Sequence, residues 1–190
     1  MPMRKEKKDL RIVRTKKYLY EALMALLKEK TFEEIKVSDI CEEALVNRST
    51  FYSHYNDKYD LLDAFIKDIK ISLKEELEKN NNITNTKEYY LEMLRIFFQH
   101  VGKRESFYSS ILLRNQNGIV TDMIFQALNE DIQNRLETEN RNSQRIPSDI
   151  IASFYLGAVF NMGVEWLKYP SKYTTEELLL YLDKLLPESL

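Results

Sequence analysis

Few residues in this chain can interrupt a helix. Its 190 residues include four glycines and four prolines, and apolar residues recur three and four positions apart through most of the sequence. This spacing gathers apolar side chains on one face of an α-helix, whereas a strand requires alternation. The sequence therefore predicts an all-α protein, and a helical chain of this length can bury a proper core.

Capping residues and apolar spacing predict about nine helices. The first ends near Glu29, and two short helices follow within residues 36–56. A helix of about twenty residues then begins at Asp57, because Asp57 and Asp60 are spaced as in a capping box. Five more helices are expected, beginning near Asn85 and Glu105, after Gly118, and near Ser148 and Thr174.

The segment Lys36–Leu62 has the organisation of a helix-turn-helix. Ser38 and Asn47 are residue types that cap helix N-termini, so each predicts the start of a short helix. In the second helix Phe51 and Tyr55 are four positions apart and share one face, while hydrogen-bonding side chains occupy the others. One face can pack while the other contacts a partner, which is how the second helix of this motif enters the DNA major groove.

A specific run of residues carries a resemblance across Thr15–Leu62. It consists of Asp39-Ile40, Ala44, Val46, Thr50-Phe51-Tyr52-Ser53-His54-Tyr55, Lys58 and Leu61-Leu62. This run resembles the DNA-binding domain of the TetR family of bacterial transcriptional regulators. The resemblance implies an N-terminal three-helix helix-turn-helix domain, residues 1–56, joined by a long helix to a C-terminal helical bundle. That bundle, residues 57–190, would bind an effector and form dimers.

The chain departs from the family pattern at three positions. The family usually has glycine where this chain has Thr31, Leu45 and Ser49. Glycine supplies positive φ at little cost, so Leu45 either bears strain of about 1 to 2 kcal/mol or the turn has another shape. The departures concern the docking geometry and leave the predicted fold intact.

The resemblance places the DNA contacts on the second short helix and its flanks. Tyr52, His54 and Lys58 correspond to positions that donate to phosphates, although each taken singly is also an ordinary surface residue. Arg48 is the candidate for base recognition because arginine pairs with guanine, and a phosphate contact is its alternative. The full predicted DNA-binding set is Ser38, Asn47, Arg48, Ser49, Thr50, Tyr52, Ser53, His54 and Lys58.

Positive charge is concentrated at the N-terminus. The formal net charge of the chain is −2, yet eight of the first 17 residues are basic and two are acidic. Because this cluster directly precedes the helix-turn-helix, it is well placed to meet DNA phosphates. The alternative is a solvated terminus without a partner.

Aromatic residues are frequent in the C-terminal part. Aromatics at helical spacing are usually core residues, but together they exceed what a plain bundle needs, which favours an apolar effector pocket between helices. The tentative lining of this pocket is Tyr90, Phe97, Phe107, Phe125 and Phe154.

No catalytic or metal-binding pattern is apparent. There is no nucleophile with a base and no glycine-rich phosphate loop, and His100 has no second histidine or cysteine nearby. Cys41 is interpreted as a packed residue, with a redox sensor as a remote alternative. We expect no enzymatic activity, cofactor or metal. The single cysteine, a charged N-terminus and the lack of a run of about 18 apolar residues predict a cytoplasmic protein that does not span a membrane.

These features predict a sequence-specific transcriptional regulator. The resemblance implies, as the favoured form, a ligand-responsive repressor that acts as a homodimer on a roughly palindromic double-stranded operator, with Ser148–Lys168 and Thr174–Leu186 pairing between subunits. One alternative is an activator, or a regulator controlled by a protein partner. Another is a helical interaction protein that does not bind DNA, which salt-dependent binding would distinguish from the others.

Overall fold

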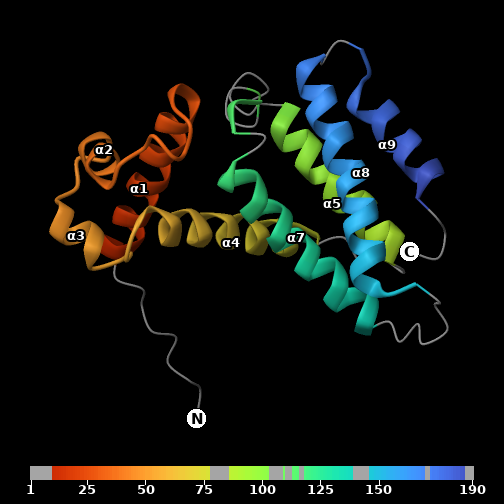
Figure 1. The fold of residues 1–190 in the computed structure, drawn as a ribbon, viewed down its shortest axis with the longest axis horizontal. Helices are drawn as coiled ribbons and strands as arrows, with labels where there is room; N and C mark the ends of the chain where they lie inside the picture. The colour runs from red at the N-terminus through yellow and green to blue at the C-terminus, as the bar shows by residue number, and fades with distance from the viewer. Residues whose placement is uncertain are drawn as a thin grey trace. The chain divides into compact units, whose positions relative to one another are not determined.

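The computed structural model describes residues 10–77, 86–102, 109, 113–115, 118–138, 146–169 and 172–186. Within these residues the regular structure is helical and no strand occurs, which confirms the all-α class (Figure 1). The chain forms two compact units, Met1–Phe65 and Ile66–Leu190.

Helices with the expected order fill the described residues. They are α1 (Leu10–Glu29), α2 (Val37–Glu43), α3 (Arg48–Tyr52), α4 (Lys58–Leu77), α5 (Thr86–Gly102), α7 (Ile119–Thr138), α8 (Ser148–Lys168) and α9 (Thr175–Leu185) (Figure 1). The helix expected over Glu105–Leu113 lies mostly outside the described residues. The long helix α4 starts in the first unit and ends in the second.

Local capping contacts fix the starts of α4 and α9. The Asp60 N–H donates to Asp57 Oδ1 at 2.9 Å, as the spacing of these residues predicts. Before α9, the Glu177 N–H donates to Thr174 Oγ1 at 3.1 Å and the Thr174 N–H donates to Glu177 Oε2 at 2.8 Å. This pair completes a capping box, so two backbone donors at the helix end are satisfied.

A buried apolar core holds the first unit together. It draws on α1, the connection to α2, both short helices and the first turn of α4. Its members with almost no exposure are Leu19, Leu23, Leu27, Phe32, Ile35, Ile40, Phe51, Leu61 and Leu62. Each such side chain contributes about 1.5 to 3 kcal/mol when it leaves water. The short helices therefore depend on this core for their stability.

Two apolar clusters form the core of the second unit. The first joins α5, α7 and α8 through Tyr90, Ile132, Leu136, Ala152 and Leu156. The second joins α5, α8 and α9 through Phe98, Trp166, Leu167, Leu178, Leu179 and Leu182.

Trp166 belongs to the interior of the second cluster. Its ring packs edge-on against Phe98 with 5.3 Å between centroids, and its Nε1 donates to the Tyr173 carbonyl at 3.1 Å. Only 7% of the residue is exposed. Trp166 is therefore a core residue of the single chain, so it cannot serve as a probe of a surface between subunits.

Two lysines add polar links between helices of the second unit. Lys70 of α4 donates to the Ala127 carbonyl of α7 at 2.9 Å and lies 3.5 Å from Asp131 Oδ1. Lys87 of α5 is buried and pairs with Asp183 of α9 at 3.1 Å. These contacts fix the C-terminal half of α4 to α7 and the first turn of α5 to α9.

Leu45 has a left-handed backbone conformation, with φ at 54°. It lies in the turn between α2 and α3, where the Val46 N–H donates to the Cys41 carbonyl at 2.9 Å. The Leu45 side chain is 93% exposed, so burial does not offset the backbone strain. Of the two possibilities that the sequence left open, the structure shows the strained turn.

Replacing Leu45 by glycine is expected to stabilise the first unit. Leu45→Gly removes strain of about 1 to 2 kcal/mol and adds unfolded-state freedom that costs about 0.5 to 1 kcal/mol. The free energy of unfolding should therefore rise by about 0.5 to 1 kcal/mol, as measured by urea unfolding. Leu45→Ala is the control, because alanine keeps the Cβ atom and the strain. Equal stability of the glycine and alanine variants would contradict the strain.

Candidate nucleic-acid interface

The short helix α3 buries one side and exposes the other. Phe51 is fully buried. Tyr55 lies three residues beyond the end of α3 and is 8% exposed, and its N–H donates to the Phe51 carbonyl at 2.9 Å. Both rings are therefore buried, as their spacing predicts, although the helix ends before Tyr55. Among the residues predicted to meet DNA, Asn47, Arg48, Ser49, Tyr52 and Ser53 are exposed, while Thr50 and His54 are half-buried. Their contacts with DNA stay a prediction.

Short contacts order the exposed side of α3. The Tyr52 ring packs edge-on against Phe51 with 5.4 Å between centroids, although 57% of Tyr52 is exposed. Ser53 Oγ donates to the Thr50 carbonyl at 2.7 Å. Asn47 occupies the N-cap position of α3 but makes no side-chain capping bond. Its amide is therefore not used to cap the helix.

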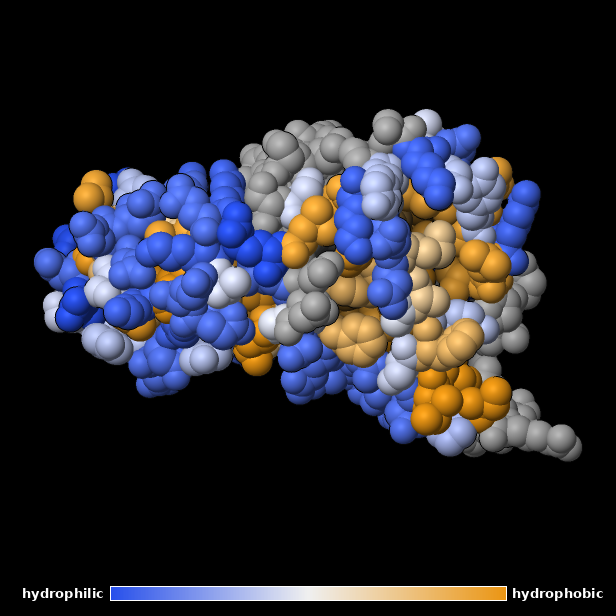
Figure 2. Space-filling model, turned by 45° about the horizontal axis from the view of Figure 1, so that its top comes forward, coloured by the Kyte–Doolittle hydropathy of each residue, from blue (hydrophilic) through white to orange (hydrophobic). Residues whose placement is uncertain are grey.

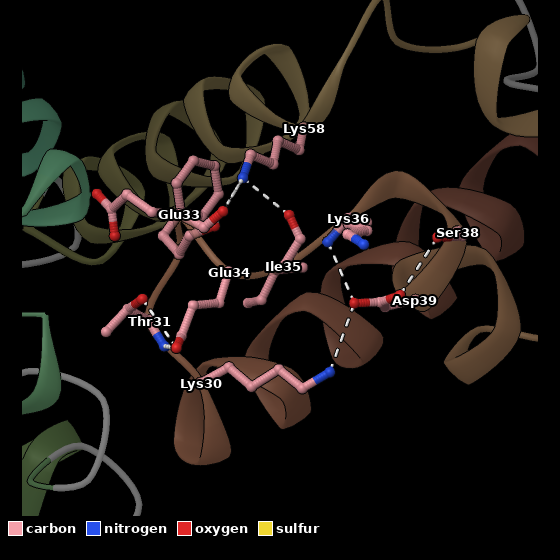
Figure 3. Close-up of polar contacts among 10 residues, drawn as sticks. Lys30, Thr31, Glu33, Glu34, Ile35, Lys36, Ser38, Asp39 and Lys58 are labelled. Carbon is pink, nitrogen blue, oxygen red and sulfur yellow. Dashed lines mark hydrogen bonds and ion pairs between the residues drawn. The ribbon is translucent and has the colours of Figure 1, made fainter.

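A carboxylate, Asp39, organises the start of α2 (Figure 3). Asp39 Oδ2 accepts a hydrogen bond from the Lys36 backbone N–H at 3.2 Å and lies 3.5 Å from Lys30 Nζ. Asp39 Oδ1 accepts from Ser38 Oγ at 3.2 Å. The bond from the Lys36 N–H lowers the pKa of Asp39 most; burial opposes it, and Lys30 and Ser38 act in its direction.

Ser38 is not the N-cap of α2. The helix begins at Val37 after Lys36, so Ser38 is its second residue and that prediction was wrong. The start is fixed by the Asp39 carboxylate, which reaches back three positions to the Lys36 N–H. Ser38 is half-buried, and its predicted DNA contact stays a prediction.

Lys58, the first residue of α4, has its ammonium bonded within the first unit. Lys58 Nζ donates to the carbonyl oxygens of Phe32, Glu33 and Ile35 at 2.8, 3.0 and 2.8 Å (Figure 3). An ammonium has three N–H groups, so these acceptors use all of its donors. Burial lowers the pKa of Lys58, and the charges of Glu33 and Asp39 oppose this effect. The predicted phosphate contact of Lys58 does not fit this geometry.

Cys41 is a buried free thiol in α2. Burial raises its pKa, and the charge of Arg48 opposes this effect. A buried protonated thiol packs as a small apolar group, in agreement with the interpretation of Cys41 as a packed residue. Among the described residues, no three His, Cys, Asp or Glu side chains are grouped so that they could hold a metal ion.

The residues predicted to bind an effector do not all lie together. Tyr90 is buried in the first cluster of the second unit, and Phe125 packs against that cluster. Phe154 is 68% exposed, so its assignment to an interior pocket was wrong. It is two positions from both Ala152 and Leu156, which places it on the opposite side of α8. Phe107 and the side chain of Phe97 lie outside the described residues.

Several apolar residues of α8 and α9 remain at the surface. Exposure is 56% for Ile150, 68% for Phe154, 51% for Leu180 and 67% for Leu185. Figure 2 shows apolar residues gathered over the second unit, whereas the first unit is mostly hydrophilic in the same view.

By length and composition alone, α8 is the one described helix that could cross a membrane. This does not contradict the lack of a run of about 18 apolar residues, because Asp149, Ser153, Asn161 and Glu165 interrupt the apolar residues of α8. The criterion is weak evidence, because core helices of globular proteins also meet it.

Asp39→Asn is expected to destabilise the first unit at neutral pH by about 0.5 to 2 kcal/mol, the range for loss of a helix-capping carboxylate. Because the folded pKa of Asp39 is lowered, its contribution is present above the usual Asp pKa of about 3.9. The contribution is lost as the pH falls through the folded value. Wild type and variant should therefore converge in acid when urea unfolding is measured across pH.

Glu42→Gln is the matched control, because Glu42 is an exposed carboxyl group on the same helix. This variant should unfold like the wild type at neutral pH. A constant difference between Asp39→Asn and wild type at every pH would contradict the role of the ionised carboxylate.

Two family models match the chain. The model described as "Transcriptional regulator C-terminal region" matches residues 88–188. The model described as "Bacterial regulatory proteins, tetR family" matches residues 19–65. The two matches together cover most of both units.

Solved structures with a similar fold include two TetR proteins. A TetR transcriptional regulator from Streptococcus agalactiae is 29% identical, with 93% of this chain and 96% of that chain covered and a TM-score of 0.66. FadR of Thermus thermophilus, a TetR family repressor in complex with lauroyl-CoA, is 20% identical, with 92% and 94% covered and a TM-score of 0.60. The latter similarity shows the shared fold.

A shorter match lies in a larger relative. The HTH-type transcriptional regulator YxbF of Bacillus subtilis is 40% identical over 53 residues. These residues are 28% of this chain and 14% of YxbF.

Proposed function

The chain belongs to the TetR family of bacterial transcriptional regulators, and we propose that it is a repressor that binds a roughly palindromic operator as a homodimer. In this proposal residues 1–56 bind DNA in the cytoplasm, and residues 57–190 form the dimer and bind a small effector that releases the operator. The observation that carries the proposal is the exposed polar side of α3, which is backed by the buried Phe51.

Sequence recognition is assigned to the exposed residues at the start of α3. Arg48 can donate two hydrogen bonds to a guanine edge in the major groove, while Ser49 and Thr50 discriminate little between bases. Tyr52 and His54 are assigned to phosphates, which fix the register of the helix without reading sequence. The exposed Arg11, Arg14 and Lys17 of α1 add positive charge next to residues 1–9, which lie outside the described residues.

The homodimer is assigned to the exposed apolar sides of α8 and α9. Ile150 and Phe154 are one helical turn apart on α8, and Leu180 and Leu185 lie on α9. Two such helices from each subunit would form a four-helix interface. A dimer can present two α3 helices to successive major grooves, which lie roughly 34 to 36 Å apart.

The effector is proposed to bind in the apolar interior of the second unit. Tyr90 is buried there and Phe125 packs against the same cluster, and Phe97 and Phe107 remain part of the proposed lining. The lauroyl-CoA in the complex of T. thermophilus FadR supports an effector with an apolar portion. A ligand that lowers operator affinity a hundredfold must favour one state of the protein by about 2.7 kcal/mol.

Footprinting of the DNA upstream of its own gene tests the proposed function. We expect a protected region with approximate two-fold symmetry and an affinity that falls steeply with salt. A reporter placed behind this region then separates repression from activation. If no upstream sequence is protected, the helical interaction protein becomes the better account.

Arg48→Ala and Tyr52→Phe are expected to behave differently. Loss of a base contact at Arg48 should cost about 1 to 3 kcal/mol and weaken the preference at one position of each half-site. Tyr52→Phe keeps the packed ring but removes a phosphate donor, so it should weaken every sequence alike. Fluorescence anisotropy with duplexes changed one base pair at a time measures both. Uniform losses for both variants would contradict the assignment of Arg48.

Phe154→Glu is expected to convert the dimer into a folded monomer, because a carboxylate cannot be buried in an apolar interface without a partner. Light scattering gives the mass, and circular dichroism reports whether the helices persist. Gln99→Glu is the control, since Gln99 is an exposed polar residue of α5. Trp166→Glu should instead unfold the second unit. A dimeric Phe154→Glu variant would contradict the proposed interface.

A further inference from the structure

The ammonium of Lys58 closes a contact between two segments far apart in the sequence. Its three acceptors are carbonyl oxygens in the connection between α1 and α2, and they lie 23 to 26 positions before it. Figure 3 shows the lysine reaching from the first turn of α4 toward this connection. All three distances are 3.0 Å or less, which is typical of charge-assisted hydrogen bonds.

Aromatic rings complete the surroundings of this ammonium. Lys58 Nζ lies 4.8 Å from the centroid of the Phe32 ring and 5.5 Å from that of Tyr59, within the range of cation–π attraction. A cation at the first residue of a helix otherwise faces the positive end of the helix dipole. The carbonyls and rings therefore supply the negative potential that this position requires.

The connection that Lys58 holds is itself ordered. The Glu34 N–H donates to the Thr31 carbonyl and the Ile35 N–H to the Phe32 carbonyl, both at 3.2 Å. Glu34 Oε2 also accepts from the Thr31 N–H at 2.9 Å. Phe32 and Ile35 are buried. Residues 31–35 are therefore an ordered segment, called the platform below, to which Lys58 attaches the start of α4.

The platform leads directly into the helix-turn-helix. The next residue, Lys36, precedes α2 and is bound by Asp39 (Figure 3). The short helix α2 packs against both α1 and α3. The start of α4 follows α3 after a few residues in the chain, and Lys58 fixes that start to the segment before α2. The hydrogen bonds of Lys58 therefore join the residue that follows α3 and begins α4 to the residues that precede α2, so both ends of the helix-turn-helix are held together.

We propose that Lys58 is a positioning residue for operator binding, which fixes α3 by clamping α4 to the α1–α2 connection, and not a ligand of DNA phosphate. The inference rests on the proposed DNA binding of this chain. A phosphate contact would require the ammonium to give up at least one of three short hydrogen bonds, because it has no further donor.

Two substitutions separate a clamp from a phosphate ligand. Lys58→Arg keeps the charge and can still donate to a phosphate, but a planar guanidinium cannot direct three N–H groups at carbonyls that converge on one nitrogen. Lys58→Met keeps the apolar stem and removes all donors. For a clamp, both variants should lose about tenfold in affinity for the duplex protected upstream of the gene. The slope of log K against log salt should stay that of the wild type.

A phosphate ligand predicts the opposite pattern. Lys58→Arg would bind like the wild type, and Lys58→Met would lower the magnitude of the salt slope by about 0.9. Either result overturns the inference. Wild-type affinity in both variants also overturns it, because the clamp would then stabilise the fold without positioning α3. Lys74→Met, an exposed lysine of the same helix, is the control and should change neither affinity nor slope.

A spectroscopic measurement covers the case in which a variant does not fold. In wild-type protein labelled with ¹⁵N-lysine, the clamp predicts that the ammonium protons of Lys58 exchange slowly and that their signal is unchanged by the duplex. A shift of this signal on addition of the duplex overturns the inference. If the wild type does not bind the duplex, the proposed function itself is overturned. If the wild type binds and only the variants or the lysine signal depart from expectation, the inference about Lys58 alone is overturned.

Discussion

The burial of Phe51 is the interaction on which the helix-turn-helix depends. The helix α3 has five residues, and an isolated helix of that length is unstable in water. It persists because Phe51 is fully buried and Tyr55, just beyond the end of the helix, is nearly so, which fixes both the helix and its rotation. With these two rings inside, Arg48, Ser49 and Tyr52 are left outside. The exposed polar side is thus a consequence of the packing of the opposite side.

Polar contacts fix where the short helices begin, which apolar packing alone does not. Burial is non-directional, so it holds short helices together without fixing their exact starts. In the first unit that task falls to Asp39, which binds the Lys36 N–H, and to Lys58, which binds three carbonyls. Each uses backbone atoms as partners, so the contacts restrain the main chain itself. The turn between α2 and α3 carries backbone strain, because Leu45 has a left-handed φ at a position where glycine would be unstrained.

Much of the fold could be predicted from the sequence because its signals are local. The capping contact of Asp57 with Asp60 and the capping box of Thr174 with Glu177 join residues three positions apart. The burial of Phe51 and Tyr55 likewise followed from their spacing. The role of Lys58 could not be predicted, because its acceptors are backbone carbonyls brought close only by tertiary folding. Phe154 was misplaced because its aromatic side chain was taken as a sign of burial, although Asp149, Ser153, Asn161 and Glu165 mark the exposed side of α8.

The exposed side of α8 raises the question of which environment covers it. Apolar length alone would suit a lipid bilayer as well as a protein. The exposed residues of α8, however, include Asp149, Ser153, Asn161 and Glu165 beside Ile150 and Phe154. Charged groups are costly in hydrocarbon, where neither water nor a partner is at hand. A second protein surface can cover the apolar residues while it leaves the charged ones at a hydrated rim. The mixture of residues on this face therefore favours a protein partner over lipid, and a second copy of the chain supplies the same mixture in a self-complementary form.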